Sequence, residues 1–160
     1  MIRLRDDIYA VEGGVVFLVL TSASAYGNRI YIRHDDGSTA MYAHLSKFEC
    51  SQGDCIQAGD KIGVMGDTGN GSGTHLHISY FSKYAKELRG EYASDPTYWI
   101  ILSGFWPTNT KVSGGYQEMY KDANGNSYPH EGIDFCYSEL IDGWANTKID
   151  TMAQDMRIQL

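Results

Sequence analysis

The sequence predicts a mostly β protein, an antiparallel β-sheet domain with few short helices. Its 160 residues include 18 glycines and 12 tyrosines, and these residue types favour turns and strands over long helices. Between residues 9 and 81, short apolar or alternating segments are separated by glycine-containing turns. A chain of this length is expected to form one domain that is large enough to bury a core.

The first strands are predicted from apolar runs and from alternation. Residues 9–20 are expected to form one or two strands, broken at Gly13-Gly14, and a polar loop covers residues 21–28. Residues 29–33 alternate with a period of two, which is typical of a half-buried strand. The segment 35–37, Asp-Asp-Gly, is a hairpin turn signal, so the chain is expected to turn back there.

The return strand is expected at residues 38–44. Short strands punctuated by glycines are expected around Ile56, Ile62 and residues 64–65, and residues 76–81 read as a further strand.

The rest of the chain is expected to be less regular. The segment 82–91 is the only clear helical pattern, and it is short and charged. Residues 94–101 carry aromatic side chains that are expected to pack against the domain. Residues 103–126 are rich in turn signals, and residues 144–160 are expected to form a terminal helix or a loose tail.

Composition excludes several classes of partner. The net charge is −7 and the lysines and arginines do not cluster, so neither nucleic acid nor an anionic membrane is an expected partner. The longest apolar run, residues 15–20, is too short to cross a bilayer, so no membrane insertion is expected. Residues 1–7 lack an apolar segment that ends in a cleavage site, so no secretory signal is expected.

Four of the five histidines fall into three motifs that suggest a metal site. His75 and His77 follow the glycine-rich run 66–74 and open a strand, in which residues two apart point to the same face. His44 lies in the second motif, Tyr-Ala-His-Leu at 42–45. This arrangement can present one metal ligand next to one acid/base group.

The third motif is His-Glu-Gly-Ile-Asp, with His130 and Asp134 at its ends. Pro129 and Gly132 argue against a helix, so we expect a loop that enters a strand and turns both end residues toward one ion. Histidine and aspartate suit a catalytic zinc, which keeps an open position for water and lowers the pKa of that water to about 7. The protein must also supply a base and a donor for the oxyanion.

Each motif alone also has an ordinary structural interpretation. A single His44 is commonly structural, His75 and His77 could form a polar strand face, and His130 with Asp134 could be a hydrogen-bonded loop pair. Their joint occurrence beside a glycine-rich loop favours the metal site.

Four other side chains are weighed in the same way. Cys50 and Cys55 flank a turn, where a disulfide is possible and two free thiols are favoured. Cys136 is interpreted as a small buried residue, with metal ligation as the alternative. His34 lies beside a charged turn and is interpreted as exposed.

The order of these motifs resembles that of the lysostaphin/LytM-type zinc endopeptidases, which cut peptidoglycan peptides. The resemblance covers the segments 9–16, 26–34, 42–46, 53–54, 58–63, 66–69 and 75–77, and residues 95–98 resemble the family's usual ending. It implies the family's antiparallel fold of the duplicated-hybrid-motif type, with a narrow active-site groove. It also implies zinc as the cofactor and a peptidoglycan peptide as the substrate.

One departure concerns the order of the motifs. The family's His-x-Gly-x-Asp motif precedes the core, whereas here it follows it, at 130–134. The chain therefore resembles a circularly permuted member, with a core at 8–101, the family's opening segment at 104–136 and a tail at 137–160. Permutation is plausible where termini lie close together at the surface. Domain swapping between two chains, or a fragment of a tandem array, would give the same order.

By the resemblance, the zinc ligands are His130, Asp134 and His77. His44 and His75 then form the pair that activates water and stabilises the tetrahedral intermediate.

The loops 22–28 and 69–73 are expected to wall the groove, and Tyr26, Asn28 and Tyr42 are candidate substrate contacts. The protein is expected to act at the cell wall as a monomer, with a swapped dimer as the alternative. The absence of an expected secretory signal favours a protein that acts in phage lysis or is released from a larger protein.

Two functional alternatives remain open. One is a non-catalytic cell-wall-binding or scaffold module on the same fold. The other is a structural zinc β domain in which Cys136 closes a four-ligand shell, because structural zinc sites leave no open position.

Overall fold

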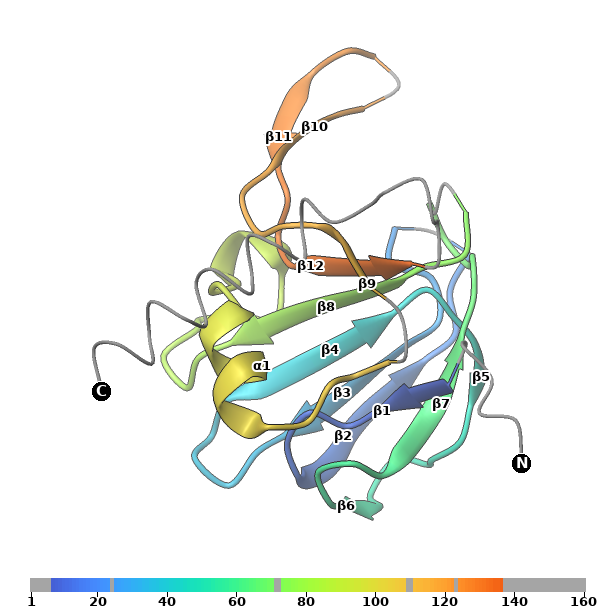
Figure 1. The fold of residues 1–160 in the computed structure, drawn as a ribbon, viewed down its shortest axis with the longest axis vertical. Coiled ribbons are helices and arrows are strands. Elements are labelled where there is room, and N and C mark those ends of the chain that lie inside the picture. The colour runs from blue at the N-terminus through green and yellow to red at the C-terminus, as the bar shows by residue number, and fades with distance from the viewer. Residues whose placement is uncertain (1–6, 24, 71–72, 109–110, 123, 137–160) are drawn as a thin grey trace.

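The computed structural model describes residues 7–23, 25–70, 73–108, 111–122 and 124–136, so the expected C-terminal tail lies outside the described residues. Strands dominate this part of the chain, as the sequence predicts, and they pair antiparallel (Figure 1). The strands are β1 (Asp7–Tyr9), β2 (Gly14–Leu20), β3 (Arg29–Arg33), β4 (Thr39–Ala43), β5 (Leu45–Phe48), β6 (Cys55–Ile56), β7 (Lys61–Met65), β8 (Leu76–Phe81), β9 (Lys111–Gly114), β10 (Met119–Lys121), β11 (Ser127–Pro129) and β12 (Ile133–Cys136).

A seven-stranded sheet in the order β6-β2-β3-β4-β8-β12-β9 forms the body of the domain. The last two strands of this order come from the C-terminal part of the described chain and extend the sheet beside β8 (Figure 1). A three-stranded sheet, β1-β7-β5, packs across one face, and β10 and β11 form a hairpin that projects from the domain.

The seven-stranded sheet buries apolar side chains on both faces, because successive residues of its central strands point to opposite faces and are apolar on each. Ile30 and Ile32 of β3 belong to the main core, whereas Tyr31 between them belongs to a smaller cluster. On β8, Ile78 points into the main core and Phe81 into the smaller cluster. By the same period of two, His77 and Ser79 lie on the face of Phe81.

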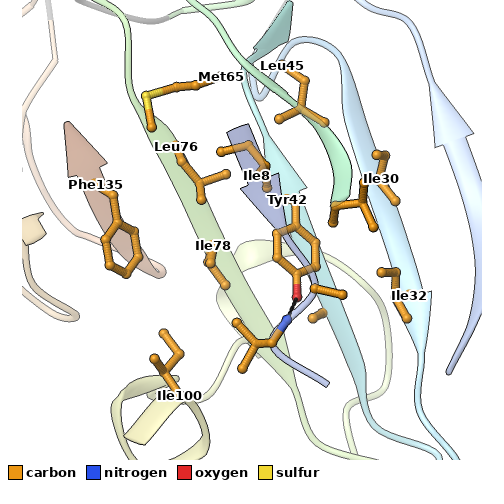
Figure 2. Packing of buried hydrophobic residues seen from close by; sticks show 14 of the residues in the cluster. Ile8, Ile30, Ile32, Tyr42, Leu45, Met65, Leu76, Ile78, Ile100 and Phe135 are labelled. Carbon is orange, nitrogen blue, oxygen red and sulfur yellow. Dashed lines mark hydrogen bonds between the residues drawn. The ribbon is translucent and has the colours of Figure 1, made fainter. Parts of the chain in front are cut away.

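Tyr42 lies in the main core, among isoleucines of the neighbouring strands (Figure 2). Its side chain is fully buried, and its hydroxyl accepts a hydrogen bond from the Val11 backbone N–H at 2.9 Å. Tyr42 pairs with Ile78 across the β4–β8 ladder, so it faces away from His77. The prediction that Tyr42 contacts substrate is therefore wrong.

The helix lies later in the chain than predicted. Residues 82–89 form turns, followed by the short 3₁₀ helix η1 (Gly90–Tyr92), while the α-helix α1 covers Thr97–Ser103. A helix at 82–91 would be short, and short helices depend on tertiary packing. The N-cap residue of α1 is Pro96, and the carboxylate of the preceding Asp95 accepts hydrogen bonds from the Thr97 backbone and hydroxyl at 2.9 and 2.6 Å.

His34 is buried rather than exposed, so that prediction is wrong as well. Its Nδ1 donates to the Gly13 carbonyl at 2.8 Å, and its ring lies 5.6 Å from that of Trp99. Cys50 and Cys55 are both free thiols, as favoured. Within the described residues, no helix has the length and apolar character needed to cross a membrane.

Candidate metal centre and active site

Pairing of β8 with β12 brings the candidate ligands together. Asp134 lies directly opposite His77 in the antiparallel register. Ile133 and Phe135 point into the main core, so Asp134 between them points to the face that carries His77. His130 lies in the loop just before β12, as the sequence predicts.

The three side chains converge on one point. His77 Nδ1 lies 3.1 Å from His130 Nε2 and 3.0 Å from Asp134 Oδ1, and the last two atoms are 3.1 Å apart. Tetrahedral zinc with bonds near 2.0–2.1 Å would space its ligand atoms by about 3.3 Å. Two imidazole nitrogens and one carboxylate oxygen at nearly this spacing fit zinc, and this is the group of potential ligands found among the described residues.

When the two histidines are neutral, hydrogen bonds outside the triad favour the tautomers in which the converging nitrogens carry no proton. His130 Nδ1 lies 2.9 Å from the Gly115 carbonyl, which can only accept, so Nε2 keeps its lone pair. The Ser79 hydroxyl donates to the Glu131 carbonyl at 3.0 Å and therefore accepts from His77 Nε2 at 2.8 Å, which frees Nδ1. Such partners orient metal-binding histidines and fix their tautomer.

The glycine of the third motif is explained by close packing. A Cβ atom at residue 132 would overlap the Ile78 carbonyl and lie 2.8 Å from two atoms of the His77 ring. The motif can therefore approach β8 only with glycine between its two ligands.

Mutual interactions also perturb the ionisation of the triad. Without a metal ion, burial, the largest single influence, would raise the pKa of Asp134, but hydrogen bonds and charge from the protonated forms of His130 and His77 outweigh it and hold that pKa well below its usual range. Burial lowers the pKa of His77. Burial would also lower the pKa of His130, but its hydrogen bond to Asp134 and the charge of that carboxylate raise it. The carboxylate thus stays ionised, as a metal ligand must.

His44 and His75 form a second pair beside the triad. Their ring centroids are 4.4 Å apart, and the His44 ring lies 6.1 Å from that of His77. His44 Nδ1 donates to the Thr68 carbonyl at 2.7 Å and His75 Nδ1 to the Gly73 carbonyl at 2.8 Å. In the neutral form, both residues therefore keep an Nε2 lone pair that can accept a proton.

His44 is held in an unusual backbone conformation between β4 and β5. Its φ of 63° lies in the left-handed region, which residues other than glycine rarely adopt and which occurs at functional sites. Burial, opposed by the bond to Thr68 and reinforced by His75 and His77, lowers the pKa of His44 to about 4. The ring is therefore neutral around pH 7.

A cavity of about 330 Å³ opens over both groups of histidines. Its wall comes from four parts of the chain and consists of Ala25, Tyr26, His44, Asn70, His75, His77, Tyr120, Tyr128, His130, Glu131 and Asp134. The two expected loops thus contribute, although residues 24, 71 and 72 lie outside the described part of the chain. Within the described part of the chain, this cavity lies where the groove between the loops 22–28 and 69–73 was expected.

Of the three candidate substrate contacts, only Tyr26 is in the cavity wall. Burial, and then the hydrogen bond to Glu131, raise the pKa of its phenol above the usual range. Asn28 is not in the cavity wall, and its side chain accepts the Ser22 backbone N–H at 3.2 Å. Tyr42 is in the core, and Cys136 is not part of the ligand group.

Sequence reasoning missed several residues of the site, including Glu131 and Tyr128 of the cavity wall, and Ser79 and Tyr120 show two different reasons. Ser79 could have been found, because it lies two residues after His77 on the same face of one strand. Tyr120 carries no comparable signal: it lies on the β10–β11 hairpin, and its ring stacks on that of His130 at 4.7 Å. Only the fold brings it there.

Comparison with known proteins supports the resemblance to the lysostaphin/LytM-type endopeptidases. Residues 2–89, more than half of the chain, match Peptidase family M23. The chain is 48% identical over 52 residues to the DD-carboxypeptidase/endopeptidase Mpg of Neisseria meningitidis, covering 32% of this chain and 12% of that protein. It is 32% identical over 127 residues to the glycyl-glycine endopeptidase ALE-1 of Staphylococcus capitis, covering 78% of this chain and 32% of that protein. The chain therefore spans only a minor part of either relative.

Among solved structures, the catalytic domain of lysostaphin from Staphylococcus simulans is 28% identical, with a TM-score of 0.56. That match covers 62% of this chain and 74% of the lysostaphin domain. Sequence and fold thus lead to the same group of proteins. The chain belongs to Peptidase family M23 and is of the lysostaphin/LytM type.

Proposed function

We propose that the protein is a zinc-dependent endopeptidase that hydrolyses peptide bonds of bacterial peptidoglycan. The observation that carries this proposal is the convergence of two imidazole nitrogens and a carboxylate oxygen, from His77, His130 and Asp134, at a cavity that His44 and His75 also line. Relatives named as endopeptidases support the reaction class. The site of action would be the cell wall.

In this proposal His77, His130 and Asp134 hold the zinc, and no described cysteine completes a closed shell. Zinc held there would polarise the scissile carbonyl and lower the pKa of a water molecule to about 7. His44 and His75 are the acid/base pair: one Nε2 takes the proton of the attacking water, and the protonated ring donates to the oxyanion or the leaving nitrogen. The neutral form of His44 around pH 7 supports the accepting role.

We further propose that residues 8–101 and 104–136 are the two parts of one permuted domain. Pairing of β12 with β8 within the same chain supports this organisation. The family match ends at residue 89, before the third motif, which is consistent with a changed order.

The test measures zinc content and the release of dye from labelled cell walls. His77→Ala should abolish both zinc binding and lysis, and a chelator should stop lysis by the wild type. His34→Gln is the matched control, because it changes the buried histidine outside the cavity and should retain zinc. Lysis by His77→Ala would overturn the assignment. A wild type that binds zinc and walls without lysis would instead be a non-catalytic module.

A further inference from the structure

The cavity wall contains two carboxylates among the described residues, and only one belongs to the ligand triad. Asp134 bonds to His77 and His130. The carboxylate of Glu131 instead accepts a hydrogen bond from the Tyr26 hydroxyl, and no lysine or arginine of the described residues pairs with it. Glu131 is therefore a charge in the cavity wall that lacks a cationic partner there.

The direction of the Tyr26–Glu131 hydrogen bond determines which chemical groups this part of the cavity wall can bind. A carboxylate only accepts hydrogen bonds, so the phenol must donate its proton to it. The phenol oxygen keeps its lone pairs, and the carboxylate keeps further acceptor positions. Both groups therefore present acceptors, and one of them carries a negative charge.

Close packing holds the Glu131 side chain in place. A Cβ atom at residue 90 would overlap the Glu131 carboxylate and would lie 2.7 Å from the Tyr26 hydroxyl. Gly90 starts η1, so the loop after β8 lies directly against this pair. The ring of Tyr26 in turn lies 5.1 Å from that of His77. The two hydrogen-bond acceptors, Tyr26 and Glu131, are thus held together with Gly90 by three separated segments of the chain, and they lie beside the triad.

We infer that Glu131 and Tyr26 form a subsite for a primary ammonium group of the substrate. An ammonium has three donors and no acceptor, which complements this pair of acceptors, and among the described residues no lysine or arginine lines the cavity to compete for it. The inference rests on the proposed function and narrows its substrate class. The enzyme prefers wall peptides with a free amine close to the scissile bond, whether that amine is an α-amino terminus or a side-chain amine.

The experiment compares the rate of release from purified peptidoglycan with that from the same peptidoglycan after N-acetylation of its free amines. Hydrogen bonds to charged groups predict that the wild type releases fragments about tenfold faster from the untreated material. Glu131→Gln keeps the shape and removes the charge, so this ratio should fall close to one. Gly90→Ala, which displaces the carboxylate, should lower the ratio as well.

Glu49→Gln is the matched control, because it removes one carboxylate that pairs with Lys47 and Lys61 outside the cavity. It should keep the wild-type ratio. Mass spectrometry of the released fragments would distinguish an α-amino terminus from a side-chain amine at the cleaved bond.

Equal rates on both wall preparations, or an unchanged ratio in Glu131→Gln, would overturn the subsite while leaving the peptidase activity in place. Absence of zinc-dependent release from either preparation would count against the proposed function itself. The two failures are therefore distinguishable.

Discussion

Pairing of β8 with β12 predicts that one chain completes the zinc site without help from a second. The perturbation is the removal of one ligand from each part of the chain, as His77→Ala in the core and His130→Ala in the C-terminal motif. Each variant loses one of three ligand atoms that lie 3.0–3.1 Å apart. Neither should bind zinc as a monomer.

The magnitude follows from linkage between binding and folding. Zinc at about a thousand times its dissociation constant stabilises the folded state by about 4 kcal/mol. At roughly 2–4 °C per kcal/mol for a chain of this size, the wild-type melting temperature should rise by about 8–16 °C on zinc addition. His130→Ala should show almost none of this rise and should lose the one zinc per chain of the wild type.

The assay combines size-exclusion chromatography, elemental analysis and thermal melting, followed by a mixing step. The two variants are unfolded together, refolded at equal concentrations and analysed again. In a swapped dimer, random pairing would rebuild about one quarter of the sites from an intact core and an intact motif of different chains. Completion within one chain predicts no recovery.

Two results would refute the reasoning. Recovery of about a quarter of the zinc on mixing would show that sites form between chains. A monomeric His130→Ala that keeps one zinc and the wild-type melting shift would show that another residue is the ligand.

Two further predictions concern single side chains. Tyr42→Phe leaves the buried Val11 N–H without its acceptor, so it should lower the free energy of unfolding by about 1–3 kcal/mol. Denaturant unfolding measures this free energy. Loss of activity in Tyr42→Phe at unchanged stability would indicate that Tyr42 contacts the substrate after all. In the metal-free protein, NMR should show His44 titrating near pH 4 rather than 6.5. Because the unfolded state then binds more protons between these values, the contribution of neutral His44 to stability is complete above about pH 6.5 and is lost as the pH falls toward 4. A midpoint near 6.5 would contradict the burial that the structure shows.

Local patterns were sufficient for much of the fold. Alternation in β3, the turn signal that follows it and the apolar character of β8 are properties of a few consecutive residues, and the structure confirms both strands and the turn. The expected half-burial of β3 is wrong, because Ile30, Tyr31 and Ile32 are all buried. The helix was misplaced, because the charged pattern at 82–91 says nothing about what that segment packs against. The position of His34 failed for the same reason, since a polar turn can still bury one of its side chains.

The sequence by itself determined the strand-rich class, the three motifs and the family to which they belong, because these depend on residue types at short fixed spacings. Only the tertiary structure decided which side chains share the cavity. Tyr42 and His44 are two residues apart in one motif, yet the pairing of β4 with β8 buries Tyr42 in the core, and the left-handed turn of the backbone at His44 sends that ring to the cavity. Tyr120 and the partnership of Tyr26 with Glu131 likewise depend on contacts between distant segments. Strand register sets such contacts, and where the paired strands lie far apart in the sequence, as β8 and β12 do, no hairpin turn between them fixes that register.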